Sequence, residues 1–415
     1  MRVHSSSEDP TMIQRVLTGL LLSSLLAVAV PGHAAPDDGW RTSWSSAPDS
    51  AGPALPAQTL RQVVRTSAGG GRVRVRLSNL FGTTPLTLGA AHVGVSAGGA
   101  HVQPGSDHTL TFGGRAAVTI APGASAVSDP VDLAVGARQV LAVSLYLPSG
   151  VPVSTIHGAA LQTAWVNAPG DATAAADLPS AATDDSRYFL SDVEVQGTDA
   201  ARTLAIVGDS IADGIGSGDD HDARWPDALA ARLQADPALA ATGIANGGIA
   251  GNRVLNDAST PFVGPGVLAR FDRDALDKPG VRWVLLHEGI NDITAAQLLS
   301  APGQQVTVEQ IEAGMRTLAA RARARGVRIW AGTLLPFAGT KHFYSEAAER
   351  QRQALNAWIR AAGAFDAVVD FDATLRDPAN PSRLNPAYDS GDHLHPNETG
   401  YRVMAQQVDL RLLRP

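Results

Sequence analysis

Cysteine is absent from the 415 residues of the sequence, and this absence excludes several kinds of chemistry. Without cysteine there is no disulfide bond, no catalytic thiolate, no cysteine-ligated zinc and no iron–sulfur cluster. Lysine is almost absent as well, because Lys278 and Lys341 are the only two, so Schiff-base catalysis has few candidates. The stability of the fold must therefore come from burial of the hydrophobic residues, which make up 44% of the chain.

An excess of positive charge is also lacking. The formal net charge is −7, and only 18% of the residues are charged. Broad nucleic-acid binding requires a basic surface, so we expect no nucleic-acid partner. The hydrophobic fraction is that of a folding protein, and the 41 glycines and 26 prolines indicate many loops or short strands. The sequence does not specify an oligomeric state.

The sequence contains an apolar run near its start, but that run is too short to span a membrane. Val16–Val30 is uncharged and follows Arg2 and Arg15, and small residues lead up to Ala34. A spanning helix needs about 20 apolar residues. A charged start, a short apolar stretch and a small-residue cleavage point are typical of a signal peptide over residues 1–34. An uncleaved anchor is the alternative. We expect cleavage after Ala34, no stable membrane span afterwards, and a secreted or extracytoplasmic location in a bacterium.

The segment 35–198 has the alternation of apolar and polar residues that marks half-buried strands. In Val73–Ser78, valine and leucine alternate with arginine and serine. Further short strands separated by glycine and proline are expected at Thr109–Phe112, Val118–Ile120, Val140–Leu147 and Arg187–Val195. This pattern predicts an all-β sandwich, jelly-roll-like, with a boundary near Gln196–Asp199. Such a domain could bind carbohydrate, shape a substrate cleft, or serve only as a structural partner.

The segment 199–415 instead alternates buried strands with amphipathic helices. Strands are expected at Thr203–Val207, Val281–Leu286, Arg328–Leu335 and Ala367–Phe371. Helices are expected at Trp225–Ala235, Val308–Arg325 and Ala347–Ala362, and in a last segment lined by Tyr401, Met404 and Val408. Thr307 and Gln310 have the spacing of a capping box. This order predicts a three-layer α/β/α domain with a parallel sheet, and ligands bind such sheets at the carboxyl ends of the strands.

The segments that follow these strands carry the residues for acyl transfer. They are Gly208–Ser210, Asn246–Asn252, Glu288–Asp292 and, near the end of the chain, Asp392–Pro396. A serine hydroxyl becomes a nucleophile when a base removes its proton, and histidine suits this role because its ordinary pKa lies near neutrality. Asp392 and His395 are three residues apart, close enough to pair within one turn, and Ser210 supplies the hydroxyl.

The oxyanion formed during acyl transfer needs hydrogen-bond donors that are already in place. The Ser210 N–H, the Gly251 N–H and the Asn291 amide could converge on it. Each residue also has an ordinary explanation: a helix cap, a turn, an Asx turn or a surface ion pair. The joint pattern, with its members in this chain order, is more specific than any one of them.

With these residues in place, the sequence resembles the SGNH, or GDSL, hydrolase family over residues 200–412. The four blocks of the family match Gly208–Ser210, Asn246–Gly251, Gly289–Asp292 and Asp392–Pro396. The resemblance implies that Ser210 is the nucleophile and, with Asp392 and His395, forms the triad. It also implies that Gly251 and Asn291 complete an oxyanion hole with Ser210, and that no cofactor or metal takes part.

A closer branch of secreted two-domain acylhydrolases, similar to an arylesterase associated with xylanases, is matched too. The stretches that resemble it are Ile249–Arg253, Ala269–Asp272 and Tyr388–Asp392. The resemblance implies a carboxylic-ester hydrolase that acts on short acyl groups, with acetyl groups on carbohydrates as a candidate substrate. Two alternatives stay open: a lipase or lysophospholipase, and, from another class, a non-catalytic polysaccharide-binding protein. The natural ester is not fixed.

Other motifs are weaker candidates for a catalytic or metal site. Gly94–Gly98 fits the G-x-S-x-G elbow around Ser96, but that elbow needs a following helix and its flanks are β-rich. His393 could pair with His395 on a metal or replace it as the base, and Gly218–Asp222 could hold calcium, although a solvated loop is the simpler reading.

Three aromatic residues are candidates for lining the acyl site, namely Trp225, Phe337 and Tyr344. Aromatic residues near sheet ends more often serve packing.

Overall fold

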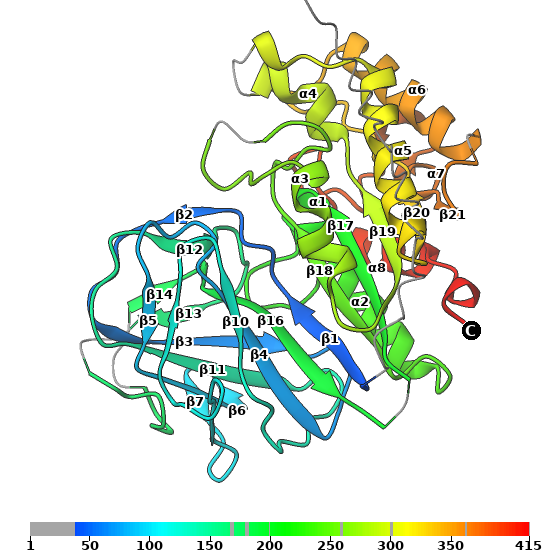
Figure 1. The fold of residues 1–415 in the computed structure, drawn as a ribbon. Helices are drawn as coiled ribbons and strands as arrows, with labels where there is room; N and C mark the ends of the chain where they lie inside the picture. The colour runs from blue at the N-terminus through cyan, green and yellow to red at the C-terminus, as the bar shows by residue number, and fades with distance from the viewer. Residues whose placement is uncertain are drawn as a thin grey trace, which may run out of the picture. The chain divides into compact units, whose positions relative to one another are not determined.

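The computed structural model describes residues 38–166, 170–178, 182–198, 200–257, 260–298, 302–361 and 363–414. The predicted signal peptide, residues 1–34, lies outside the described residues. Residues 40–196 build a region of strands, the β region, and residues 202–413 build a region of strands and helices, the α/β region (Figure 1). Together they belong to one compact unit, Asp37–Pro415, so the division at 198/199 stays a prediction.

The β region contains two larger antiparallel sheets. The first has the order β1-β16-β4-β10, formed by Trp40–Ser45, Leu190–Gln196, Arg72–Ser78 and Ser125–Val127. The second has the order β14-β13-β3-β11-β6-β7, formed by Ala182–Asp184, Ala164–Val166, Gln58–Arg65, Val140–Leu147, Ala90–Gly98 and His101–Val102, with β8 His108–Thr109 beside β6. Small sheets join β15 Arg187–Tyr188, β12 Ser154–His157 and β2 Ser50–Gly52, and β5 Leu86–Leu88 with β9 Val118–Ile120.

The two larger sheets share one hydrophobic core. Val75 and Val193 from the first sheet and Leu60 and Val143 from the second are fully buried in it. The alternation along Arg72–Ser78 explains this arrangement, because Val73, Val75 and Leu77 point to the same face of their strand. The expectation of a β-rich sandwich is confirmed.

The α/β region is built on a parallel sheet with the order β18-β17-β19-β20-β21. Its strands are Thr242–Gly248, Arg202–Gly208, Val281–His287, Arg328–Gly332 and Ala367–Val369. A two-stranded ribbon, β22 Arg376–Asp377 and β23 Asn380–Leu384, lies outside it. The helices are α1 Ser210–Asp213, α2 Trp225–Ala235, α3 Val267–Phe271, α4 Ile290–Leu298, α5 Val308–Ala324, α6 Glu346–Ala361, α7 Phe371–Leu375 and α8 Glu398–Gln407.

Helices cover both faces of the parallel sheet (Figure 1). Ala205 and Val207 of β17 pack into a core with α3, α5 and α6. Leu204 and Ile206 of the same strand pack on the opposite face with α2, α7 and α8. Because consecutive residues of a strand point to opposite faces, a strand covered on both sides must be apolar throughout, as Thr203–Val207 nearly is. The predicted α/β/α layering is confirmed.

Strand β20 ends at Gly332, earlier than the predicted Leu335. Beyond it, Leu334 donates its N–H to the Asn356 side chain at 2.7 Å, outside the ladder of the sheet. Strand β21 likewise ends at Val369, since Asp370 caps the helix α7. At both points a side chain accepts a backbone N–H just beyond the strand, which the apolar pattern alone does not reveal.

The edge strand β18 lies beside β1 of the β region. The hydroxyl of Ser45 donates to the Asn246 carbonyl at 2.8 Å, and the Ile244 N–H donates to Ser67 at 2.8 Å. A Cβ at Gly243 would come within 2.0 Å of the Thr42 carbonyl, so a side chain there would separate the strands. The two regions therefore contact each other through backbone as well as side chains.

No helix in the described part of the chain combines the length and the hydropathy that crossing a bilayer requires.

The capping box at the start of α5 supplies a first prediction. The N–H of Gln310 donates to the Thr307 hydroxyl at 3.3 Å, and the Thr307 N–H donates to the Gln310 side chain at 2.8 Å. We expect Thr307→Ala to lower the free energy of unfolding by about 0.5–2 kcal/mol, measured by urea denaturation. Thr317→Ala, at an exposed position within the same helix, is the control and should change it by less than about 0.5 kcal/mol. Equal effects of the two variants would contradict a capping role.

Candidate active site

Ser210 lies at a sharp turn between strand β17 and helix α1. Asp209 precedes it and caps the helix by accepting the Ile211 N–H at 2.9 Å. Gly208 permits the turn, since a Cβ there would come within 2.5 Å of the His287 carbonyl. The Ser210 side chain is thereby held at the carboxyl end of the sheet, where the residue is 7% exposed.

His395 and Asp392 meet this serine from the other end of the chain. The Nε2 atom of His395 lies 2.8 Å from the Ser210 Oγ atom, and its Nδ1 atom lies 2.6 Å from the Asp392 Oδ2 atom. The second oxygen of Asp392 accepts the N–H groups of Leu394 and His395, each at 2.8 Å. The structure thus brings three sequence-predicted residues into one continuous hydrogen-bonded chain.

Hydrogen bonds close the loop that carries Asp392 and His395. The Ser390 N–H donates to the His395 carbonyl at 3.0 Å, and the Asn397 N–H donates to the Tyr388 carbonyl at 2.8 Å. Gly216, at φ +92°, allows the chain after α1 to approach, because a Cβ there would lie 2.7 Å from the Pro396 carbonyl. The imidazole is therefore fixed by its own loop and by the segment that follows the serine.

The electrostatics of Asp392 suit the partner of a histidine. Burial favours the neutral acid and raises the pKa of Asp392, but hydrogen bonds from the side chain and backbone of His395 outweigh it and hold the pKa below its usual range. Asp392 is therefore an anion at neutral pH, and it can orient the imidazole and stabilise its protonated form.

Gly251 lies in the loop after strand β18. Its φ is +74°, which glycine adopts without strain, and a Cβ there would come within 2.1 Å of the Val263 side chain. Next to it, the Asn252 amide donates to the carbonyls of Val263 and Pro265, at 2.6 and 2.9 Å. This tie folds the loop back on itself and explains why a side chain at position 251 has no room.

Asn291, in the first turn of α4, lies against the same loop. Its Nδ2 atom donates to the Asn252 carbonyl at 3.0 Å, and this bond uses one of its two amide hydrogens. The next residue, Asp292, accepts the N–H groups of Val254 and Leu255 at 2.7 and 3.1 Å. The Asn-Asp pair therefore holds the loop in place, and the remaining amide hydrogen of Asn291 is available for a ligand.

Arg270 is a structural residue of the site that the sequence reasoning did not identify. Its buried guanidinium donates to the Gly208 carbonyl at 3.1 Å, the Gly247 carbonyl at 2.6 Å and the Asn252 side chain at 3.0 Å. It pairs with Asp274 at 3.1 Å. The stretch Ala269–Asp272 belonged to the resemblance, but nothing in it indicated that this arginine joins the ends of two strands.

Three carboxyl groups are buried around the serine turn. Burial raises the pKa of Asp209 to about 7 and that of Asp292 to about 6, although backbone N–H groups lower both. Burial and the neighbouring Asp209 and Asp292 raise the pKa of Glu288 well above its usual range. The neutral form of Glu288 is therefore favoured, which limits the negative charge gathered around the serine turn.

The other candidates are placed elsewhere. Ser96 lies within strand β6 with no helix after it, and His393 pairs with Asp389 at 2.6 Å instead of contacting Ser210. In the Gly218–Asp222 loop, Asp220 accepts from Thr163, and Asp222 pairs with an arginine. Within the described ranges, no cluster of three or more histidine and acidic residues could hold a metal ion.

The three aromatic candidates lie mainly in the core. Trp225 and Phe337 are fully buried, against Phe371 and Tyr344 respectively, and Tyr344 is half-buried. Trp225 and Phe337 expose no surface that a substrate could contact, because they fill the space between sheet and helices. Of the three aromatic residues, Tyr344 therefore stays a prediction for lining the acyl site.

The raised pKa of Asp209 predicts a change of stability with pH. In the unfolded chain an aspartate ionises near pH 3.9, whereas in the folded protein this one stays protonated up to about pH 7. Unfolding between these values releases a proton, so this group makes stability fall as pH rises from about 4 to about 7, by at most about 1.4 kcal/mol per pH unit.

We expect Asp209→Asn to weaken this pH dependence, because the amide keeps an acceptor for the Ile211 N–H and cannot ionise. The free energy of urea unfolding at pH 5 and pH 7 measures it. Asp219→Asn, at an exposed position, should leave the dependence unchanged. An Asp209 variant with the dependence of the parent would refute the assignment.

Comparison with known proteins agrees with this geometry. Residues 206–403 match the model of the GDSL-like lipase/acylhydrolase family. No curated protein matches the chain.

Solved structures similar to parts of the chain include a lipolytic protein of the G-D-S-L family from Desulfitobacterium hafniense DCB-2, at 18% identity, covering 49% of this chain and 96% of its own, with a TM-score of 0.37. An acetylxylan esterase from Geobacillus stearothermophilus shares 23% identity over 51% of this chain and 93% of its own, with a TM-score of 0.39. An alpha/beta hydrolase from the metagenome of Lake Arreo, Spain, shares 22% sequence identity. The match covers 50% of this chain and 92% of the hydrolase, with a TM-score of 0.39.

The matched residues run from strand β17 to helix α8 and include Ser210, Gly251, Asn291, Asp392 and His395. Most of the α/β region therefore matches the GDSL-like lipase/acylhydrolase family, and this match supports the hydrolysis of carboxylic esters.

Proposed function

We propose that the chain is a secreted serine esterase that cleaves short acyl groups, acetyl above all, from carbohydrate or other polar esters. The observation that carries this proposal is the hydrogen-bonded chain from Ser210 through His395 to Asp392, with lengths of 2.8 and 2.6 Å. A buried nucleophile, a base in contact with it and an anion that orients the base are the parts that ester hydrolysis by serine requires.

In this proposal His395 accepts the hydroxyl proton of Ser210 as its Oγ atom attacks the ester carbonyl. The tetrahedral intermediate collapses when His395 returns that proton to the departing alkoxide, leaving an acyl group on the serine. Water then attacks the acyl group, with the same imidazole as base, and the acid leaves. Asp392 stabilises the imidazolium at both steps.

The negative oxygen of each tetrahedral intermediate requires donors that are fixed before the reaction. We assign this role to the N–H groups of Ser210 and Gly251 and to the free amide hydrogen of Asn291. Three hydrogen bonds support the assignment. The Asp209 side chain accepts the Ile211 N–H at the serine turn, and the Asn252 amide donates to the Val263 carbonyl across the glycine loop. The third runs from the Asn291 amide to the Asn252 carbonyl and orients Asn291. Each fixes a donor without occupying it.

The proposed preference for short or polar esters is based on how few large hydrophobic side chains are exposed on the described surface. Among the described residues, the exposed large hydrophobic side chains are Phe262 and Val368, which are separate in the sequence. A lipase that works at a lipid surface needs a continuous apolar patch. The lipase or lysophospholipase alternative lacks this support, and a purely carbohydrate-binding role leaves the aligned serine, imidazole and carboxylate without a purpose.

Replacement of the nucleophile gives the most direct test. We expect Ser210→Ala to lower kcat/KM on a chromogenic acetyl ester by about four or more decades, because the covalent step is lost. Ser96→Ala, which changes the serine of the other candidate motif, is the matched control and should keep the activity of the parent. If Ser210→Ala retained most of its activity, the serine mechanism would be wrong.

The acyl preference is tested with esters of increasing chain length. We expect kcat/KM to be highest for acetyl or propionyl esters and to fall by about tenfold or more for decanoyl esters, since about 1–3 kcal/mol of discrimination is typical of a fitted pocket. Release of acetate from acetylated xylan, measured by an enzymatic acetate assay, would extend the preference to glycans. A maximum at long chains would favour the lipase alternative.

A further inference from the structure

We propose that the β region helps to build the oxyanion hole, with His157 acting through Asp213 as a positioning residue for the loop that carries Gly251. This inference deepens the proposed function and rests on it. It assigns a role to the β region, whose own sequence left that role open.

Asp213 is the point where the parts meet. It lies three residues after Ser210, at the end of helix α1, and is buried. One carboxylate oxygen accepts the N–H of Ala250 at 3.0 Å, and the other lies 3.1 Å from the Nε2 atom of His157. A single carboxylate therefore joins the serine turn, the glycine loop and the β region.

The contact with Ala250 has a direct consequence for the donors. Ala250 precedes Gly251, so Asp213 holds the peptide next to the proposed donor. The loop is also close to the helix, since a Cβ at Gly248 would come within 2.3 Å of the Asp213 nitrogen. The position of the Asp213 carboxylate thus contributes, together with Arg270, to the distance between the N–H of Ser210 and that of Gly251.

His157 holds that carboxylate from the side of the β region. It ends strand β12, and its Nδ1 atom lies 2.9 Å from the Ala47 carbonyl and 3.5 Å from Asp49. Asp49 is itself fixed by the Gly158 N–H and the Ser50 hydroxyl, both at 2.6 Å. With acceptors facing both ring nitrogens, the imidazole donates in both directions.

The charge of His157 follows from these neighbours. Burial lowers the pKa of His157, but the facing carboxylates of Asp213 and Asp49 and the Ala47 carbonyl raise it to about 9. The residue is 4% exposed. A buried imidazolium between two carboxylates is held firmly, because removal of one member leaves a buried charge without its partner.

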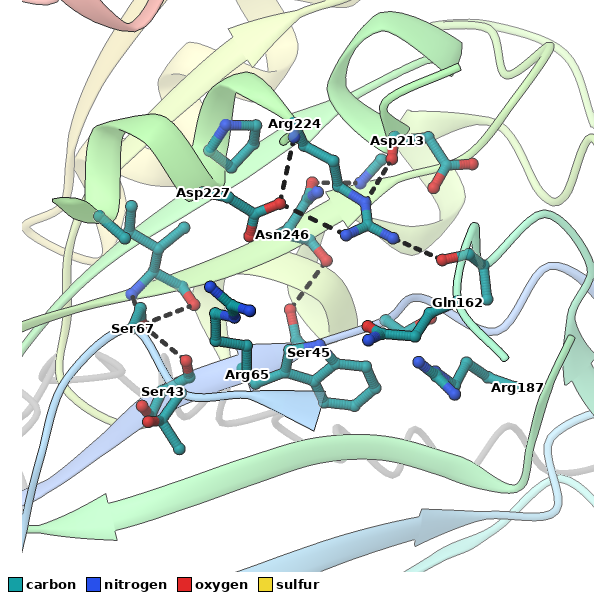
Figure 2. A pocket seen from close by; sticks show the side chains of 18 of the residues that line it. Ser43, Ser45, Arg65, Ser67, Gln162, Arg187, Asp213, Arg224, Asp227 and Asn246 are labelled. Carbon is teal, nitrogen blue, oxygen red and sulfur yellow. Dashed lines mark hydrogen bonds and ion pairs between the residues drawn. The ribbon is translucent and has the colours of Figure 1, made fainter. Parts of the chain in front are cut away.

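A second residue, Arg224, also links Asp213 to the β region. Arg224, before helix α2, donates from its Nε atom to the Asp213 carbonyl at 2.9 Å and from Nη2 to the Ala160 carbonyl of the β region. Figure 2 shows Arg224 and Asp213 on one side of a pocket and Ser43, Arg65 and Ser67 of the β region on the other. His157 lines the same pocket. Two polar links between the regions, through His157 and through Arg224, therefore meet at Asp213.

The test compares the steady-state kinetics of His157→Phe and His157→Gln on a chromogenic acetyl ester. We expect His157→Phe to lower kcat by about 10–100-fold with KM changed by less than about threefold, since a displaced donor weakens the transition state and not ground-state binding. Glutamine can still donate to Asp213, so His157→Gln should recover most of kcat. Affinity for a phenylboronic acid, whose tetrahedral adduct mimics the intermediate, should fall in parallel with kcat.

The matched control is His92→Phe, because His92 forms an imidazole–carboxylate pair with Asp107 at 2.7 Å within the β region. It should keep the kcat of the parent. Thermal unfolding shows whether each variant is folded at the assay temperature. If His157→Phe does not fold, Asp213→Ala takes its place, since alanine has no side-chain acceptor for the Ala250 N–H or for His157, and the same loss of kcat is expected.

Normal kcat in a folded His157→Phe or Asp213→Ala variant would overturn the inference, as would equal losses in the Phe and Gln variants at position 157. Failure of the proposed function would look different, because Ser210→Ala would then remain active. An inactive Ser210→Ala beside an active His157→Phe refutes the positioning role alone.

Discussion

The site depends on the buried guanidinium of Arg270, which joins the carboxyl ends of two parallel strands. Through the carbonyls of Gly208 and Gly247 it fixes the distance between the serine turn and the glycine loop. A buried arginine is stable only when its donors are satisfied and its charge is paired, and Asp274 supplies the charge. The loops that carry the polar side chains can vary in conformation only within the limits set by this bond network.

The sequence was sufficient for features that are local or periodic. Continuous apolar runs, typical of strands buried on both faces, predicted the parallel sheet. The three-residue spacing of Asp392 and His395 predicted that they pair, and in the structure the His395 Nδ1 atom lies 2.6 Å from the Asp392 Oδ2 atom. Contacts between distant segments were not predictable from residue types. The acceptor beyond the end of strand β20 is the side chain of Asn356, which lies on helix α6. For Trp225 the sequence left both a substrate contact and core packing open, and the residue is fully buried in the core.

Charged side chains are also buried between the two regions. Lys278 of the α/β region pairs with Asp192 of the β region, and both are buried. Such pairs add little net stability compared with apolar packing, but they are highly selective, since a mismatched neighbour leaves a charge unpaired in the interior. They therefore fix how the β region docks more than how tightly it is held.

The contact between His157 and Asp213 also bears on how this protein can have evolved. If the α/β region were moved to another β partner, Asp213 would lose its contact with the imidazole of His157, and its hold on the glycine loop would weaken. The two regions are therefore not interchangeable modules. Substitutions on one side of the junction should be tolerated only with matching changes on the other, so the halves are expected to diverge together.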